Sequence, residues 1–182
     1  MFLSLIRNRR SIRKYSEREV EANKIDQLIE AALLSPASKG SDPWEFVVVT
    51  EHGTLERLAS AKPHGSAFLK NARLAIVVCA NPAESDVWIE DASVASTYVM
   101  LAAVSLGLGS CWIQIRERMH DEIGSAEEYV ATVLNIPKYL KVESIIAIGY
   151  PDEEKAPHRK EELPYQKVSL NSYGSMYGYR SQ

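Results

Sequence analysis

The chain has 182 residues, 46% of them hydrophobic and 25% charged, and a formal net charge of −3 at pH 7. This length and composition predict a single globular domain, residues 1–182, that is large enough to bury a core of its own. The sequence contains no internal repeat and no linker between two cores. The weak negative charge disfavours nucleic acid or a membrane surface as the partner.

The N-terminus and the cysteines indicate the compartment. No apolar segment of signal-peptide type opens the chain, so we expect a cytoplasmic protein. The two cysteines, Cys79 and Cys111, lie in apolar runs, where buried free thiols are favoured over a disulfide. Such thiols agree with a reducing cytoplasm.

The first third of the chain predicts two helices, a loop and a strand. The apolar residues of segment 1–7 predict a short helix, and Glu21–Leu34 predicts a longer one, because its apolar residues fall on one helical face. Pro36 ends this second helix, since the residue before a proline is disfavoured in the α conformation. Pro36–Pro43 is a loop by composition, and Trp44–Thr50 follows as a strand.

Two apolar segments dominate the middle of the chain, after a short predicted helix at Gly53–Ala61. Leu74–Ala80 predicts a central strand buried on both faces. Asp86–Leu106 predicts the longest helix, which is apolar nearly all round and should be buried, in the core or in a subunit interface. Its acidic residues, and an uncharged run of about 15 residues where a bilayer needs about 20, argue against a membrane span. Gly107 and Gly109 are predicted to end it, because glycine tolerates the left-handed conformation.

The last third predicts a strand at Cys111–Ile115, a helix at Gly124–Leu134 and a strand at Val142–Tyr150. Residues 152–182 then change in character, because a charged, proline-containing stretch is followed by spaced aromatic residues with little capacity for a core. We expect this segment to form an extended arm that packs on a neighbouring molecule. The alternative is a frayed tail.

Near the N-terminus, three arginines surround one hydroxyl group. They are Arg9, Arg10 and Arg13 around Ser11. A guanidinium group donates hydrogen bonds in a fixed fork that matches the oxygens of a phosphate. The stretch is therefore either a solvated basic turn or a site for one small phosphate group. A nucleic-acid arm is disfavoured, because the chain is acidic overall and no basic stripe with interleaved aromatic residues follows.

The sequence offers no residues for metal-dependent or nucleophilic catalysis. None of the four histidines stands at ligand spacing from another histidine or a cysteine, so we expect no structural metal. The chain has neither the glycine–serine elbow of hydrolases nor a P-loop. If the protein is an enzyme, a cofactor is expected to carry the chemistry.

Four motifs, in the same order along the chain, resemble those of the FMN-dependent nitroreductase family. The first is the arginine stretch, with the pattern Arg-Arg-Ser-x-Arg-x-Tyr, and the last closes the final core strand with Gly-Tyr-Pro. The motifs are Arg9–Tyr15, Ser35–Phe46, Gly107–Ile113 and Ile148–Pro151. Together they span nearly the whole chain, which makes the resemblance specific for the family and less so for the substrate.

The resemblance implies an α+β fold in which a central, mainly antiparallel sheet is flanked by helices. It also implies an intertwined homodimer with a C-terminal arm and with FMN in two sites at the dimer interface. NAD(P)H would deliver hydride to flavin N5 and leave, and a nitroaromatic, a quinone or a similar small electron acceptor would then take the electrons in the same pocket. Two alternatives stay open: a specialised flavin enzyme that dehalogenates or fragments its ligand, and a non-catalytic flavin-binding dimer.

The resemblance also assigns roles to individual residues, all of them in FMN binding. The family positions that hold the FMN phosphate correspond to Arg9, Arg10 and Ser11. The position that reaches the ribityl chain and the N1/O2 side of the ring corresponds to Arg13. The loop that reaches the flavin from the partner subunit is matched by Pro36, Ala37, Ser38 and Gly40. The segment along the isoalloxazine ring is matched by Trp112, Ile113 and Gln114. Arg159 and Lys160 lie near the position, late in the sequence, where the family supplies basic residues to the phosphate.

Two positions depart from the family pattern. Gly40 stands where many members carry asparagine, which removes a side-chain contact to the flavin, and Asp42 stands where glutamine is common. Both departures bear on substrate class and redox tuning more than on FMN binding. No side chain is expected to act as an acid, base or nucleophile, because Cys111 is predicted to be a buried thiol, which is inert unless a nearby cation lowers its pKa.

Overall fold

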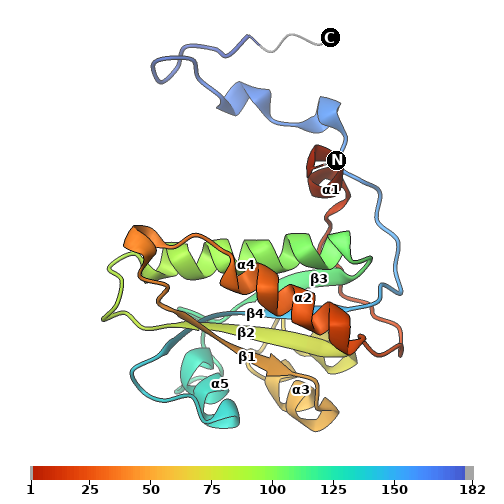
Figure 1. Cartoon of the computed structure of the whole chain (residues 1–182), viewed down its shortest axis with the longest axis vertical. Helices are drawn as coiled ribbons and strands as arrows, with labels where there is room; N and C mark the ends of the chain where they lie inside the picture. The colour runs from red at the N-terminus through yellow and green to blue at the C-terminus, as the bar shows by residue number, and fades with distance from the viewer. Residues whose placement is uncertain (1, 179–182) are drawn as a thin grey trace.

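The computed structural model describes residues 2–178, which form an α+β fold built on one antiparallel sheet (Figure 1). Within that range the sheet has four strands in the order β1-β2-β4-β3, and every neighbouring pair is antiparallel. The strands are β1 (Trp44–Val49), β2 (Leu74–Ala80), β3 (Gly109–Gln114) and β4 (Lys141–Gly149). The predicted fold class and the predicted strands are confirmed, with small shifts of their ends.

Helices cover both faces of the sheet (Figure 1): α2 and α4 lie on one face, and α3 and α5 on the other. The helices are α1 (Phe2–Asn8), α2 (Ala22–Leu33), α3 (His52–Ala59), α4 (Trp88–Ser105) and α5 (Ala126–Leu134). Short 3-10 turns are η1 (Ser38–Gly40), η2 (Ala67–Asn71), η3 (Lys160–Glu162) and η4 (Tyr165–Lys167). Met1 and residues 179–182, which the sequence places in the first helix and in the arm, lie outside the described residues.

The central strands β2 and β4 are apolar on both faces. Along β2, Ala75, Val77 and Cys79 pack toward α3 and α5, whereas Leu74 and Ile76 pack toward α2 and α4. Every residue of β2 is buried. An uninterrupted apolar run is what a strand covered by helices on both sides requires, because its successive side chains point to opposite faces.

The helix α4 is buried on one side only within the described chain. It buries Ala92, Val99 and Ala103 and leaves Thr97 exposed and Tyr98 39% exposed. Burial of its other side in a subunit interface stays a prediction, because composition alone does not distinguish a helix enclosed by its own domain from one that a second molecule covers.

The ends of α4 also differ from the predicted ones. The helix begins at Trp88, so Asp86 precedes it. Gly107 ends it in the left-handed conformation, with φ +74°, as predicted. Gly109, however, opens β3 and takes no part in ending the helix.

The uncovered side of α4 borders an apolar groove that it shares with α1 and α2. The groove has a volume of about 370 Å³ and is lined by Phe2, Leu5, Ala31, Tyr98, Leu101, Ala102 and Ser105. Exposed apolar surface of this kind is typical of an interaction site.

The arginine stretch, residues 9–15, packs against the free edge of β3. Ser11 forms a parallel bridge with Ser110, and the N–H of Ile12 donates to the carbonyl of Ser110 at 3.0 Å. A Cβ atom added to Gly109 would lie 2.8 Å from the Cβ of Ile12. The absence of a side chain at Gly109 therefore lets the stretch approach the sheet.

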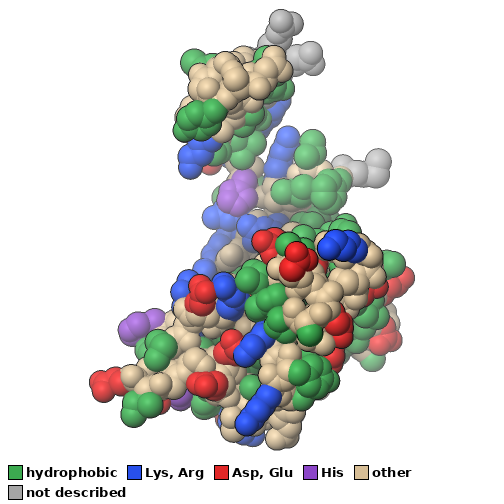
Figure 2. Space-filling view, turned by 90° about the vertical axis from the view of Figure 1, so that its left-hand side faces the viewer, with side chains coloured by type: hydrophobic (Ala, Val, Ile, Leu, Met, Phe, Trp, Pro, Cys, Tyr) green, Lys and Arg blue, Asp and Glu red, His purple; other side chains and the backbone are tan. Residues whose placement is uncertain are grey.

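The C-terminal segment first follows the arginine stretch and then leaves the body of the molecule. The N–H of Asp152 donates to the carbonyl of Lys14 at 2.9 Å, and the N–H of His158 donates to the carbonyl of Arg7 at 2.9 Å. Beyond this point the chain forms an arm that projects from the body (Figures 1 and 2). The apolar side chains of the arm, among them Tyr173 and Met176, are exposed. Packing of this arm on a neighbouring molecule stays a prediction.

Replacement of Gly109 by alanine should destabilise the protein, because the added methyl group meets Ile12. Overpacking of this kind costs about 1–3 kcal/mol, which the midpoint of urea unfolding at an unchanged m-value would report. The matched control is Gly53→Ala in α3, where the atom nearest to an added Cβ is 3.8 Å away and alanine favours the helix. A Gly109→Ala variant as stable as the wild type would contradict the close approach.

Candidate functional site

The arginine stretch lies where the C-terminal segment crosses the edge of the sheet. Arg10 donates a side-chain hydrogen bond to the carbonyl of Ala156, and Lys155 donates one to the carbonyl of Ser11. Figure 2 shows basic side chains gathered there, between the body and the arm. Residues far apart in the sequence thus build one basic corner.

Glu153 is the carboxylate that holds the backbone of this corner. Its Oε1 accepts from the N–H of Arg13 at 2.5 Å and from the N–H of Lys14 at 3.2 Å, and it forms an ion pair with Lys155 at 3.3 Å. The hydrogen bond from the Arg13 N–H is the main cause that holds the pKa of Glu153 below its usual value. Glu153 therefore fixes the turn through main-chain donors and leaves the arginine side chains available.

Among residues 2–178, none of the three guanidinium groups of the stretch, those of Arg9, Arg10 and Arg13, forms an ion pair. The guanidinium carbon of Arg13 lies 5.7 Å from the centre of the Phe68 ring. The backbone of Ser110 forms the bridge with Ser11, and its buried hydroxyl has no hydrogen-bond partner among the described residues. The guanidinium donors of this stretch fit a phosphate ester.

A cavity opens beside these groups, between the arginine stretch, the end of α4 and the segment after β4. It has a volume of about 180 Å³ and is lined by Asn8, Arg10, Ile12, Val104, Leu108, Gly109, Pro151, Glu153, Glu154 and Lys155. The structure thus brings the predicted residue Arg10 to a cavity wall and adds Lys155, which the sequence analysis did not single out.

Within residues 2–178, the strand β3 presents backbone donors without a hydrogen-bond partner at the edge of the sheet. Because the carbonyl of Ser110 accepts from Ile12, the backbone groups of Ser110 point away from β4. Backbone direction alternates along an antiparallel strand, so the N–H groups of Trp112 and Gln114 point the same way. The side chain of Ile113 is buried in the core with α3 and α5. The predicted contact of this segment with a ligand is therefore available through its backbone edge.

A row of side-chain hydrogen bonds on this strand ends on a buried carboxyl group that sequence reasoning missed. Trp112 Nε1 donates to Gln114 Oε1 at 2.9 Å, and Gln114 Nε2 donates to Glu143 Oε1 at 3.4 Å. Glu143 is 3% exposed, its Oε2 has no partner in the described chain, and burial raises its pKa. The signal available in the sequence is a charged residue inside the apolar strand 142–150.

The thiol of Cys111 lies near this corner and is not activated. Burial raises its pKa, and the charges of Arg13, Lys155 and Arg9 offset only part of that effect. Cys79 and Cys111 are both buried and free, as the sequence predicts. A protonated buried thiol is a poor nucleophile, so Cys111 contributes packing to the site.

The predicted loop lies between α2 and β1. Pro36 and Ala37 precede η1, and the turn continues through Lys39 and Gly40 in the left-handed conformation, with φ +56° and +64°. A Cβ atom at Gly40 would have no neighbour within 4 Å. The loop therefore presents open backbone at Gly40.

The loop and the arginine stretch lie at opposite ends of α4 (Figure 1). The N–H of Ser38 donates to Asp91 Oδ1, in the first turns of the helix, at 2.8 Å. Val104, near the other end, borders the cavity beside the arginine stretch. Asp91 and Val104 are about 20 Å apart along the helix axis. The loop and the arginine stretch of one chain are therefore too far apart to contact the same small chemical group.

Arg159 and Lys160 lie in the arm, beyond the contact of His158 with Arg7. The guanidinium of Arg159 is engaged by Glu162, and Lys160 opens η3. The late basic residue that the structure brings to the arginine stretch is Lys155. The sequence of the charged run 152–162 does not indicate which of its lysines points toward the arginine stretch. Phosphate binding by Arg159 and Lys160 stays a prediction.

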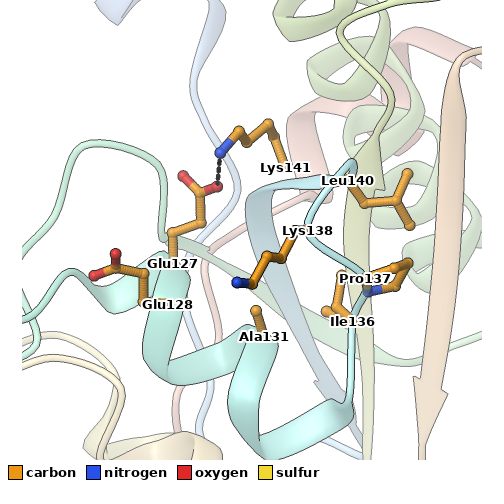
Figure 3. Close-up of a pocket in the computed structure, with 8 residues that line it drawn as sticks. All are labelled: Glu127, Glu128, Ala131, Ile136, Pro137, Lys138, Leu140 and Lys141. Carbon is orange, nitrogen blue, oxygen red and sulfur yellow. Dashed lines mark ion pairs between the residues drawn. The ribbon is translucent and has the colours of Figure 1, made fainter.

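Another cavity, of about 410 Å³, lies between α5 and the chain that leads into β4 (Figure 3). Its two acidic residues are engaged in the protein's own structure: Glu127 pairs with Lys141 at 3.3 Å, and Glu128 caps α5 through Ser125. It contains none of the predicted site residues. We therefore do not assign it a ligand.

Among residues 2–178, no group of three or more histidine, cysteine, aspartate or glutamate side chains is arranged to hold a metal ion. No helix in the same range is long and apolar enough to cross a membrane.

Known proteins match the chain in both sequence and structure. The sequence model of the Nitroreductase family matches residues 6–62 and 51–150. An FMN-dependent nitroreductase from Clostridium difficile R20291 superposes with a TM-score of 0.93, at 48% identity, over 94% of this chain and 99% of that chain.

Two curated relatives extend the comparison. A protein of Archaeoglobus fulgidus, named as a candidate NADH dehydrogenase/NAD(P)H nitroreductase, is 38% identical over 84% of this chain and 87% of its own. The FMN reductase (NAD(P)H) of Bacillus subtilis is 25% identical over 88% of this chain and 69% of its own.

Proposed function

Since the chain belongs to the Nitroreductase family, as its four motifs predict, we propose that it is an FMN-dependent oxidoreductase. It takes reducing equivalents from NAD(P)H and passes them to a nitroaromatic, a quinone or a similar small acceptor. Bound FMN supplies the redox chemistry, because a flavin accepts a hydride and releases electrons to a second ligand. The names of the relatives, which include an FMN-dependent nitroreductase and an FMN reductase, support the cofactor and the nicotinamide donor.

The main support from the geometry is that the guanidinium groups of Arg9, Arg10 and Arg13, which flank Ser11 in the sequence, form no ion pair within residues 2–178. Arg10 donates to the carbonyl of Ala156 and keeps further donors, because a guanidinium group carries five N–H bonds. Hydrogen bonds to charged groups contribute about 1.5–3 kcal/mol each. Arg9, Arg10 and Ser11 would hold the phosphate, and Arg13 the ribityl chain and the N1/O2 side of the ring.

The edge of β3 supplies the orientation of the ring. The outward N–H groups of Trp112 and Gln114 would hold the polar edge of a planar ring, with Ile113 anchoring the strand in the core. No acid or base is needed from the protein for hydride transfer, because positioning alone lowers the barrier by several kcal/mol, up to about 7–11. Donor and acceptor use one pocket in turn, which gives a ping-pong order.

A homodimer completes this site. The loop residues Pro36, Ala37, Ser38 and Gly40 would reach the flavin from the partner subunit, which agrees with their separation from the arginine stretch of their own chain. The apolar groove along α4 and the exposed apolar side chains of the arm provide surface for the subunit contact. Arg159 and Lys160 would supply late basic residues toward the phosphate.

Anaerobic stopped-flow absorbance tests the reaction. NADH or NADPH should bleach the flavin of the FMN-loaded protein, and added quinone should restore it. Cys111→Ser should keep both rates within about tenfold of the wild type, because the thiol is buried and protonated. Cys79→Ser, at the other buried thiol, is the matched control.

Two results would contradict this account of the reaction. Bound FMN that neither NADH nor NADPH bleaches would favour a specialised flavin enzyme or a non-catalytic flavin-binding dimer. A loss of about a thousandfold in Cys111→Ser, with FMN still bound, would indicate thiol chemistry.

Light scattering tests the assembly. The wild type should be a dimer, and Leu101→Glu should shift it toward the monomer by at least about tenfold in dissociation constant, because it places an unpaired charge in the apolar groove. The control is Ile123→Glu, at an apolar residue that is 94% exposed in a loop outside the groove. A folded, FMN-loaded monomer of the wild type would show that no second copy is needed.

A further inference from the structure

A buried carboxylate at the start of α4 holds the loop that contains η1. Asp91 Oδ1 accepts from the N–H of Ser38 at 2.8 Å, and Asp91 Oδ2 accepts from the hydroxyl of Ser85 at 2.7 Å. Asp91 is 5% exposed. Both oxygens of a buried charge are therefore satisfied, one by the loop and one by the chain that enters the helix.

The loop has few other attachments to the body. Its remaining main-chain hydrogen bonds between residues 37 and 41 are internal, from Gly40 to Ala37 and from Ser41 to Ser38. Lys39 and Asp86 approach to 4.0 Å, but both side chains are 83% exposed, and exposed ion pairs contribute little. In the described chain, the hydrogen bond to Asp91 is thus the buried polar link between this turn and another element.

The conformation of the loop makes such a link necessary. Lys39 and Asp42, neither of them glycine, adopt positive φ values of +56° and +46°. Left-handed conformations at such residues are sparsely populated and persist where the surroundings hold them. A released turn would therefore relax to other conformations.

We propose that Asp91 is the positioning residue of this loop: it holds the turn Ser38–Gly40 in the conformation in which its backbone meets the flavin. The proposal rests on the proposed function, because the contact between the loop and FMN comes from there. Asp91 also couples the loop to α4, whose uncovered side borders the apolar groove. One carboxylate thereby connects the flavin-facing loop to the helix proposed for the subunit contact.

The side chain at position 91 accepts two hydrogen bonds, one from the N–H of Ser38 and one from the hydroxyl of Ser85. Asparagine and alanine at this position should therefore have different effects. Asp91→Asn retains a carbonyl oxygen for the N–H of Ser38, and its NH₂ group can donate to Ser85, whose hydroxyl also accepts. Asp91→Ala retains neither contact. Asparagine should therefore preserve the loop, whereas alanine should release it.

Limited trypsin digestion of the full-length protein reads the loop directly, because Lys39 is exposed within it. Cleavage after Lys39, followed by mass spectrometry, should be at least about tenfold faster in Asp91→Ala than in the wild type, since cleavage reports the population of the opened loop. Asp91→Asn should stay within about threefold of the wild type. So should the control Asp86→Ala, which removes the exposed carboxylate near Lys39.

FMN affinity and the flavin absorbance spectrum of the same variants test the positioning role. Asp91→Ala should weaken FMN at least about tenfold and shift the spectrum, and Asp91→Asn should restore both. A wild-type rate of cleavage after Lys39 in Asp91→Ala would overturn the proposal. Faster cleavage with unchanged FMN affinity would also overturn it, as would an Asp91→Asn variant that restores neither the cleavage rate nor the FMN affinity. If Asp91→Ala does not fold, Ser85→Ala carries the test, with a smaller rise in cleavage expected and no rise contradicting it.

The wild type and the Asp91→Ala variant distinguish a failure of the proposed function from a failure of the positioning role. A wild-type protein that binds no FMN would overturn the proposed function and this inference with it, and the wild type alone reveals that result. A failure confined to Asp91→Ala leaves the proposed function standing and overturns the positioning role.

Discussion

The docking of the arginine stretch on the edge of β3 is the contact on which the site depends. One main-chain hydrogen bond, from Ile12 to Ser110, and the missing side chain at Gly109 bring the stretch against the sheet. This contact covers the beginning of the strand and leaves the outward N–H groups further along it unpaired. It therefore places basic side chains and main-chain donors along one line, which suits a ligand with an anionic end and a planar, polar-edged end.

The charges around the stretch are arranged so that the cations stay available. Glu153 lines the cavity beside the stretch, and main-chain N–H groups and Lys155 engage it. The guanidinium groups of Arg9 and Arg13 remain without an acidic partner among the described residues. Neighbouring cations repel one another, so a bound phosphate removes an unfavourable interaction as well as adding hydrogen bonds.

The sequence was most informative where a local pattern decides the structure. The apolar run of β2 and the one-sided apolar pattern of α2 predict those elements. A continuous apolar run is typical of a strand buried on both faces, and an apolar stripe is typical of a helix buried on one side. Lys155, Glu143 and Asp91 were missed, since each acts through a partner that only the folded chain brings near. One apolar side of α4 has no cover within the described chain, and its burial by a second copy stays a prediction, because periodicity does not distinguish a core helix from an interface helix.

A comparison of FMN with riboflavin, which lacks the phosphate, tests the central claim most directly. Calorimetric or fluorescence titration should show that the wild type prefers FMN, and that Arg9→Ala loses about 10–150-fold in FMN affinity while its riboflavin affinity is unchanged. Arg57→Ala, at an exposed arginine of α3, is the control and should keep the wild-type preference. An equal loss for both ligands in Arg9→Ala, or no loss for either, would show that the phosphate is not held by this stretch.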